Sequence, residues 1–443
     1  MLSNIKIDKI EAIKRLKEAG VVGAGGAGFP TYKKYEGEAK LLIINGAECE
    51  PLLGIDKVWL KYKANQILEG LVIAKELLGA EEVVVAFKRK YREITSIWEN
   101  IIVGFPYIRL YLMDNFYPAG YEHILVKEIT GKVVPPHGIP LLLGVVVNNV
   151  VTIANLGKAI KEGKSVFTRP LTITGAVREP KNLEVPVGTS IKDLIQWAGG
   201  VTVENFKFLI GGPVMGRVSD NLKEVITKTT SGVVVLPLEH PLIKFYERSP
   251  LHNKIFALNC EQCFYCTEMC PLWQMGYPLY PHRIIRAYAY EKADEAIAGA
   301  NLCCECGVCS LFACPIALDP RRVIKEFKKK INNIKSSMPT LPPSYFIPFS
   351  RIQADLLLQK LDLKNYAKPL EWDPKEYIPQ RVSIPLSQHI GTPATPLVKV
   401  GEKVKAGQVI GKVAPDTLGA YIHSSIPGEV KSISSSFIEI ERR

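Results

Sequence analysis

The sequence predicts an α/β protein in which a parallel-sheet domain precedes a small β-rich domain, a helical cysteine-rich domain and a small β-sandwich. Three observations lead to this order. Residues 1–165 alternate apolar strands with amphipathic helices, nine of the ten cysteines fall in two short runs, and residues 380–443 repeat short strands with glycine turns. A chain of 443 residues has room for several domains of about 100–200 residues each.

The first 165 residues have the pattern of a parallel sheet covered on both faces. Apolar runs predict strands, and segments with helical periodicity separate them. We expect strands at 41–44, 83–86, 108–112 and 145–147, and helices at 10–18, 66–78, 93–102 and 121–129.

Residues 166–249 change character and predict a small β-rich domain with one helix. A short strand is expected at 171–174 and a helix at 191–197. The pair Gly211-Gly212 stands before Pro213-Val214-Met215-Gly216, which indicates a tight turn where backbone approaches backbone or a ligand.

Two cysteine runs carry the strongest chemical signal in the sequence. Three thiolates two residues apart can reach three irons of one [4Fe-4S] cube, and a fourth cysteine before a proline ligates the other cube. This rule assigns Cys260, Cys263, Cys266 and Cys314 to one cluster, and Cys303, Cys306, Cys309 and Cys270 to the other.

A disulfide framework and a zinc ribbon are the alternatives for these runs. Zinc closes at four ligands, usually two separated Cys-x2-Cys pairs, so a triple repeat followed by Cys-Pro exceeds what one ion needs. Cys304 breaks the spacing, and we expect a buried thiol without a ligand role there. A helix over 281–298 should separate the runs within a cluster domain of residues 250–335.

The carboxyl-terminal part begins with a proline-rich passage. Prolines at 339, 342, 343 and 348 cannot continue a helix, so we expect an extended linker over 336–379. Short valine-rich strands with glycine turns follow, and they predict a small β-sandwich over 380–443. Its two histidines, His389 and His423, are expected on the rim of the sandwich.

Composition excludes several classes of protein. The amino terminus lacks an apolar secretory core, so we expect a cytoplasmic protein whose thiolates stay available for iron. The longest apolar stretch, 139–147, is shorter than the ~20 residues of a transmembrane helix. Aromatic residues do not interleave with basic ones, which argues against nucleic acid.

The formal net charge of +12 includes a local basic helix within 321–330. A solvated surface is one interpretation of this helix. The other is a docking face for an acidic electron carrier, a corrinoid enzyme or a membrane surface.

A glycine-rich segment from Gly23 to Thr31 follows the first predicted helix. Four of its first six residues are glycine, and such backbone amides can close around a phosphate, to which Lys34 would add a charge. No strand runs directly into the loop, so it is not a dinucleotide fingerprint. A plain turn remains the alternative.

The predicted strand 41–44 ends in a polar segment. Ligands of open sheets sit at the carboxyl ends of parallel strands, where Asn45, Glu48 and Glu50 could hydrogen-bond a flavin ring edge and a ribose. The combination of this strand end with the glycine loop favours a ligand site over a structural turn.

These motifs resemble known flavoproteins. The segment Gly23 to Thr31 with Lys34 resembles the flavin and NADH loop of the NADH-binding flavoprotein subunit of respiratory complex I, although Ala24 stands where that loop has arginine. The next motif, with Cys49 between two glutamates, is closer to the C subunits of Rnf complexes and to PduS-type cobalamin reductases. Three further segments resemble the same families: 117–122, 148–152 and, as an SLBB domain, 171–216.

The resemblance implies a fold for each part of the chain. It implies a Rossmann-like FMN/NADH domain in 1–165, an SLBB β-grasp domain in 166–249, an α-helical ferredoxin-like dicluster domain in 250–335 and a barrel-sandwich domain in 380–443. The implied cofactors are FMN, NADH and two [4Fe-4S] clusters. The residues carried over as their binding site are Gly23, Gly25, Gly26, Gly28, Phe29, Lys34, Asn45, Glu48, Glu50, Glu122, Asn148, Asn149 and Thr152.

The order of domains is that of the cobalamin reductases, because the C subunits of Rnf complexes carry the sandwich before the flavin domain. The resemblance implies an NADH-dependent oxidoreductase that passes electrons to a corrinoid, a corrinoid-dependent enzyme or another redox protein. No side chain is required as an acid or base catalyst. Two alternatives stay open: an electron-input subunit of a membrane ferredoxin:NAD oxidoreductase, and a non-catalytic electron relay.

Overall fold

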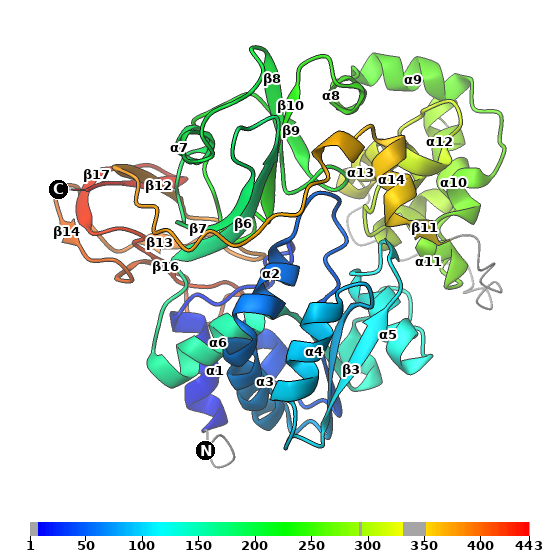
Figure 1. The fold of residues 1–443 in the computed structure, drawn as a ribbon. Coiled ribbons are helices and arrows are strands. Elements are labelled where there is room, and N and C mark those ends of the chain that lie inside the picture. The colour runs from blue at the N-terminus through cyan, green and yellow to red at the C-terminus, as the bar shows by residue number, and fades with distance from the viewer. Residues whose placement is uncertain (1–7, 292–294, 331–350, 443) are drawn as a thin grey trace.

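The computed structural model describes residues 8–291, 295–330 and 351–442. Figure 1 shows four groups of elements: an α/β domain, a mixed sheet above it, helices around the cysteine runs, and a β-sandwich at the carboxyl terminus. The predicted fold class is confirmed. The prolines at 339–348, predicted to be extended, lie outside the described residues.

The amino-terminal domain contains a four-stranded sheet in the order β3-β2-β1-β5, with every pair parallel. Its strands coincide with the predicted apolar runs, extended by one to three residues. The strands are β1 (Leu41–Gly46), β2 (Glu82–Lys88), β3 (Ile108–Met113) and β5 (Val145–Asn149), with the short β4 (Phe116–Tyr117) outside the sheet. The helices are α1 (Lys9–Glu18), α2 (Ile55–Tyr62), α3 (Ala64–Leu78), α4 (Arg92–Ile101), α5 (Glu122–Thr130) and α6 (Val150–Glu162), with 3-10 turns at Thr31–Tyr35 and Pro140–Leu143.

Both faces of this sheet are covered, but by different partners. Side chains such as Leu42 and Ile44 point to one face and pack with helices α1–α4 and α6. Ile43 and Val84 point to the other face, where they share a core with α5 and with helices of the cysteine-rich region. Alternate residues of a strand face opposite sides, so one strand joins two domains.

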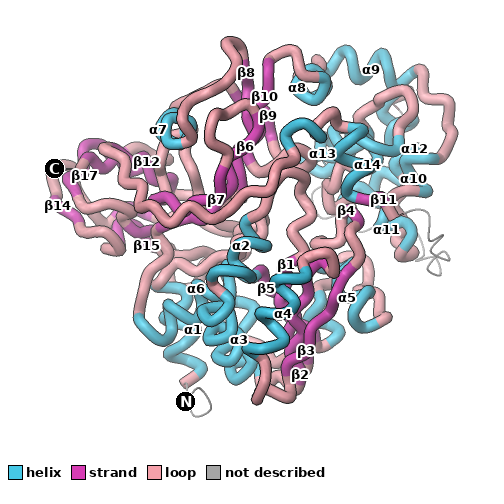
Figure 2. The backbone as a smooth tube through the Cα atoms, in the orientation of Figure 1, coloured by secondary structure: helices cyan, strands magenta, loops and turns pink. Residues whose placement is uncertain are grey.

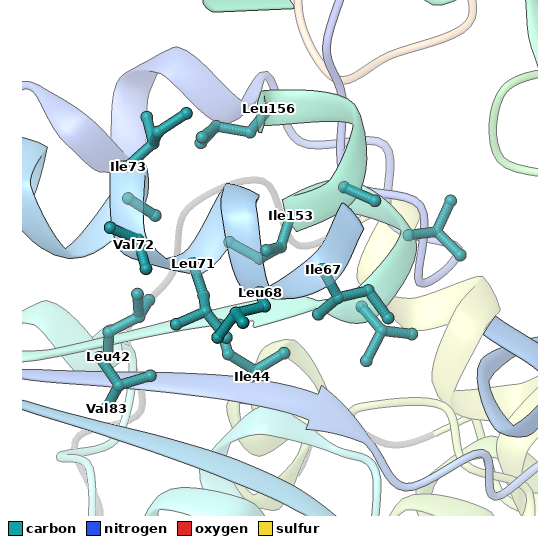
Figure 3. Packing of buried hydrophobic residues seen from close by; sticks show 14 of the residues in the cluster. Leu42, Ile44, Ile67, Leu68, Leu71, Val72, Ile73, Val83, Ile153 and Leu156 are labelled. Carbon is teal, nitrogen blue, oxygen red and sulfur yellow. The ribbon is translucent and has the colours of Figure 1, made fainter. Parts of the chain in front are cut away.

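Helices α3 and α6 pack against each other, with side chains such as Leu68 and Ile153 buried in one core (Figure 3). A Cβ atom on Gly70 would lie 2.1 Å from the carbonyl oxygen of Ile153, and one on Gly157 would lie 2.9 Å from the Cα of Gly70. This close approach fixes α6, whose first turn borders the candidate site described below.

The second domain is a five-stranded mixed sheet in the order β7-β6-β10-β8-β9. Only β6 and β10 run parallel within it. Its elements are β6 (Thr168–Gly175), β7 (Lys181–Pro186), α7 (Ile191–Trp197), β8 (Phe206–Ile210), β9 (Arg217–Ser219) and β10 (Gly232–Pro237), followed by α8 (Pro241–Tyr246).

Short helices surround the cysteine runs. They are α9 (Pro250–Leu258), α10 (Tyr265–Glu268), α11 (Pro271–Gln274), α12 (Pro281–Ala289), a 3-10 helix (Glu295–Leu302), a π-helical turn (Val308–Ala313) and α13 (Pro320–Lys330). The prediction of one helix over 281–298 is wrong. Helix α12 ends at Ala289 because Glu291 adopts the left-handed conformation, with φ of 53°.

The predicted linker contains regular structure where it is described. Strand β11 (Ile352–Gln353) pairs with β4, helix α14 (Ala354–Lys360) follows it, and a 3-10 turn covers Lys364–Tyr366. Leu357 and Leu363 are fully buried, so this segment packs against the domains instead of passing over them.

The carboxyl-terminal sandwich has sheets ordered β12-β18-β17-β14 and β13-β15-β16. Figure 2 shows it at the opposite end of the β6–β10 sheet from the cysteine-rich helices. Its strands are β12 (Arg381–Pro385), β13 (Thr395–Pro396), β14 (Lys403–Val404), β15 (Val409–Lys412), β16 (Ile422–His423), β17 (Gly428–Ile433) and β18 (Phe437–Glu441).

The expectation of rim histidines is wrong. His423 is 2% exposed and faces the amino-terminal domain near Gly20, and the half-buried His389 shares a hydrogen bond of 3.1 Å with the carbonyl of Ala420. The sandwich docks on the amino-terminal domain through this surface. Among the described helices, none combines the length and apolar character of a membrane-spanning segment.

Candidate functional site

The glycine-rich segment forms a closed loop with an open tip. The amide of Gly23 donates to the carbonyl of Phe29 at 2.8 Å, and the amide of Gly28 donates back to Gly23 at 3.2 Å. Gly25 and Gly26 are exposed at the tip. Gly26 has φ of 105°, and no atom lies within 4 Å of the position that a Cβ would take. The loop therefore leaves space for a ligand beside its free amides.

Two other side chains hold this loop from behind. The buried hydroxyl of Thr152 accepts from the amide of Ala24 at 2.9 Å. The guanidinium of Arg169, on β6, donates to the carbonyl of Ala24 at 2.8 Å and to that of Thr230 at 2.6 Å. Thr152 thus positions the loop, and the second domain contributes a buried cation to it.

Lys34 lies in the 3-10 turn Thr31–Tyr35, beside strand β5. Its ammonium donates to the carbonyl of Val147 at 2.7 Å and forms an ion pair of 3.7 Å with Glu122, the first residue of α5. Both predicted residues are half-buried. They place one cation and one carboxylate at the edge of the sheet.

The predicted asparagines meet at this edge. Asn45 and Asn149 are direct partners in the parallel register of β1 and β5. The Asn45 amide donates to the carbonyl of Gly120 at 2.9 Å, and Asn149 caps α6 by accepting from Val151. Asn148 is buried and donates to the hydroxyl of Tyr35, so its side chain points into the domain and not to the open edge.

The half-buried Glu48 lies next to the buried Asp56. Glu48 has φ of 32°, an uncommon value for a residue with a Cβ, and its carboxylate accepts from the amide of Asp56 at 2.9 Å. Asp56 in turn accepts from the Asn149 side chain at 2.8 Å. Burial, and then the neighbouring Asp56 charge, raise the pKa of Glu48, and burial also raises the pKa of Asp56. The pair can therefore hold a proton near neutral pH.

Glu50 reaches into the second domain. Its carboxylate accepts from the amides of Val214 at 3.0 Å and Met215 at 2.8 Å, inside the turn 211–216. Gly212 has φ of 118°, and a Cβ there would lie 2.5 Å from a Glu50 oxygen. Burial raises the pKa of Glu50 to about 7. Glu50 thus joins two domains, which is a role that the motif alone did not predict.

The structure gathers the eight cysteines around two hollows, in the groupings that the spacing rule gives. The outer set lines a hollow with Glu261, Phe264 and His282, and its Cys263 is exposed. The inner set lines a second hollow, and three of its four cysteines are buried. The outer set consists of Cys260, Cys263, Cys266 and Cys314, and the inner set of Cys270, Cys303, Cys306 and Cys309.

The donor chemistry of both sets fits an iron-sulfur cluster. None of the ten cysteines forms a disulfide. Within the described residues, no three His, Cys, Asp or Glu side chains are placed to hold a single metal ion. Burial, together with neighbouring thiolates, raises the pKa of Cys266 to about 12 and that of Cys309 far above its ordinary value. Four thiolates in such a space need cations between them, and cluster irons supply these.

Two neighbours of the inner set depart from expectation. Cys304, predicted to be buried, is half-buried and lines the inner hollow. Arg321, in the predicted basic helix, is buried, donates to the carbonyl of Val214, and places its charge near Cys306 and Cys309. The interpretation of this helix as a solvated surface is wrong for Arg321.

Neither Asp56 nor Arg169 was predicted from a motif, and the motif 117–122 did not predict the contact that Tyr117 makes. Asp56 and Arg169 are buried charges, and each is polar within a mostly apolar segment. Tyr117 is 2% exposed and donates from its hydroxyl to the carbonyl of Cys306 at 2.6 Å. A charge inside an apolar run was the one available hint for Asp56 and Arg169, because buried charges require partners.

Family models match four parts of the chain in succession. They are described as the Nuo51 FMN-binding domain (16–158), the SLBB domain (170–218), the 4Fe-4S dicluster domain (259–319) and the RnfC barrel sandwich hybrid domain (365–442). A crystal structure of NAD+-reducing [NiFe]-hydrogenase in the H2-reduced state is similar in fold. Its TM-score is 0.51 at 21% identity, and the match covers 72% of this chain and 61% of that chain.

Curated relatives match over different lengths. The C subunit of the ion-translocating oxidoreductase complex of Rhodobacter capsulatus is 33% identical over 252 residues, which cover 55% of this chain and 46% of that protein. Cobalamin reductase PduS of Citrobacter freundii is 36% identical over 423 residues, or 94% of this chain and 93% of the relative. Cobalamin reductase PduS of Salmonella typhimurium is 37% identical over 422 residues, with the same shares of 94% and 93%. The chain therefore belongs to the PduS cobalamin reductase family.

Proposed function

We propose that this protein oxidises NADH at flavin mononucleotide and delivers the electrons singly, through two [4Fe-4S] clusters, to a corrinoid. One observation carries the proposal: an open glycine loop at the carboxyl edge of a parallel sheet shares one chain with two four-cysteine hollows. The near full-length similarity to cobalamin reductase PduS supports the choice of acceptor.

In this proposal the loop and the sheet edge hold the flavin and the nucleotide. The exposed amides of Gly25 and Gly26 bind the flavin phosphate, and Lys34 adds a positive charge. Gly23, Gly28 and Phe29 close the loop through their backbone hydrogen bonds. The proposed boundaries are those of the sequence analysis, with residues 1–165 as the flavin domain.

The polar groups at the strand ends orient the bound molecules. The Asn45 and Asn149 side chains lie side by side at this edge, and Glu122 pairs with Lys34 beside them. The adjacent carboxyls of Glu48 and Asp56 hold a proton next to the site. Bound flavin accepts a hydride from NADH and gives up electrons one at a time, which suits clusters that take single electrons.

Two other functions remain as weaker proposals. An Rnf-type subunit is favoured by the match of residues 365–442 to the RnfC sandwich, but its relatives cover about half of this chain. An electron relay without flavin is disfavoured by the open space beside Gly26. We place the protein in the cytoplasm, where its cysteines would stay reduced and available for iron. Its partners would be NAD(H) and a corrinoid or a corrinoid-dependent enzyme.

Anaerobic reconstitution tests this proposal. The loaded protein should contain about eight irons and one flavin per chain, as two cubes and one FMN require. With NADH present, it should then reduce cob(III)alamin faster than NADH and free FMN do. A protein that binds no flavin would support the relay, and a flavoprotein that leaves cob(III)alamin at the background rate would favour the Rnf-type role.

A further inference from the structure

The two cysteine sets differ in their surroundings. In the inner set, Cys270, Cys306 and Cys309 are buried, whereas Cys266 is the one buried cysteine of the outer set. Cys306 belongs to a core that also contains Tyr117 of the proposed flavin domain and Val214 of the second domain. Cys306 of the inner set therefore lies where three domains meet.

One short segment connects the inner set to the proposed flavin site. Gly120 accepts from the Asn45 side chain at 2.9 Å, and a Cβ on Gly120 would lie 3.0 Å from the sulfur of Cys49. Three residues earlier, the hydroxyl of Tyr117 donates to the carbonyl of Cys306 at 2.6 Å. A continuous path of covalent and hydrogen bonds thus runs from the strand end to a cysteine of the inner set.

The outer set reaches solvent through one of its cysteines. Cys263 is exposed, and its neighbours Phe264 and Tyr265 are 46% and 53% exposed. Helix α10, which carries Cys266, packs against the turn that carries Cys309, so the two sets are close to each other.

We infer that electrons enter through the inner set and leave through the outer set toward a corrinoid acceptor. The rate of electron transfer through protein falls steeply with distance, and it falls further where the path crosses gaps between atoms that are not bonded. The path from Asn45 through Gly120 and Tyr117 to Cys306 has no such gap. This inference rests on the proposed function and adds a direction to it.

The electrons balance along this route. One NADH becomes NAD+ and releases one proton and two electrons. Because each cluster takes one electron at a time, the inner and outer sets are each reduced and reoxidised twice for one NADH. The acceptor receives two electrons in two single steps, which can reduce one cob(III)alamin to cob(I)alamin.

Two single-cluster variants test the direction. Cys263→Ala removes an outer ligand and Cys306→Ala removes an inner one, and the matched control is Glu268→Ala, an exposed residue within the first cysteine run that lines neither hollow. Each loaded variant is mixed with NADH anaerobically, and flavin and cluster reduction are followed by stopped-flow absorbance and freeze-quench electron paramagnetic resonance. We expect Cys263→Ala to reduce its remaining cluster at the wild-type rate. Cys306→Ala should bleach its flavin but lose reduction of its remaining cluster within the turnover time.

The opposite pattern, or equal rates in both variants, would overturn the inference. If NADH fails to bleach the wild-type flavin, the proposed function fails. The direction is then tested on the same variants by photoreduction of the flavin, so the two failures are distinguishable.

A second measurement uses the wild-type protein and does not depend on how the variants fold. An iron chelator is added anaerobically, and samples taken over time are alkylated with iodoacetamide and analysed by mass spectrometry. Outer-set cysteines, beginning with the exposed Cys263, should be labelled before inner-set cysteines. Earlier or simultaneous labelling of Cys306 and Cys309 would contradict the assignment of an inner and an outer set.

Discussion

Replacing Arg169 by methionine should weaken FMN binding. Arg169 is 2% exposed and lies on β6 of the second domain, yet its guanidinium donates to the Ala24 carbonyl within the glycine loop. Its charge also favours the ionised form of Asp56. Methionine keeps much of the length of the side chain but removes the charge and every donor.

The size of the effect follows from the hydrogen bond to the loop. A hydrogen bond to a charged group contributes about 1.5–3 kcal/mol. If the free energy of FMN binding becomes less favourable by that amount because the loop is no longer held in place, the Kd for FMN rises about 10- to 100-fold. About 1.4 kcal/mol corresponds to a factor of ten in Kd. Arg169→Lys keeps the charge without the planar fork, so its loss of affinity should be smaller.

The assay is quenching of FMN fluorescence by flavin-free protein. Arg178→Met is the matched control, because Arg178 belongs to the same domain and is exposed. Circular dichroism and iron content establish that each variant is folded. A folded Arg169→Met protein with full iron content and the wild-type Kd for FMN would refute a role for Arg169 in positioning the loop.

Three further predictions concern stability. Gly70→Ala places a methyl group against the carbonyl of Ile153 and should lower the free energy of unfolding, measured by denaturant titration, by about 1–3 kcal/mol. The control Glu76→Ala, at an exposed position of the same helix, should not lower it. Equal stabilities of the two variants would count against the contact between α3 and α6. Glu50→Ala leaves two backbone amides of the turn 211–216 without their acceptor, which should lower the free energy of unfolding by about 1–3 kcal/mol. Limited proteolysis should then cleave that turn faster than in the wild type. An unchanged cleavage rate would argue against the contact between Glu50 and the turn. Burial lowers the pKa of Lys228 to about 7, so above that pH the unfolded chain binds more protons than the folded protein. The free energy of unfolding of the wild type, relative to that of Lys228→Met, should therefore rise from pH 7 toward pH 10. A difference that does not change with pH would contradict the burial of Lys228.

Much of the fold could be predicted from local patterns. The four parallel strands are apolar runs bounded by polar turns, and burial of both faces makes such runs continuous. The cysteine groupings follow from spacing alone, because the last cysteine of each run points away from the first three. The tight turn at 211–216 could also be predicted from its glycines, because its close backbone contacts require residues without a Cβ.

The contacts between domains could not be predicted in the same way. Arg169, Tyr117 and Glu50 act on parts of the chain more than 100 residues away, and no periodicity or motif encodes such pairings. The motif around Glu50 indicated a ligand, whereas its carboxylate holds the second domain in this structure. The end of α12 was missed because its sequence continues to favour a helix where the backbone at Glu291 turns left-handed.

An anaerobic NADH titration of the fully loaded protein tests the central claim most directly. One flavin takes two electrons and two clusters take one each, so about two equivalents of NADH should reduce all three centres. Loss of the flavin absorbance and of cluster absorbance at that stoichiometry is the predicted result. A protein that holds its flavin and about eight irons but is unchanged by NADH would contradict the account.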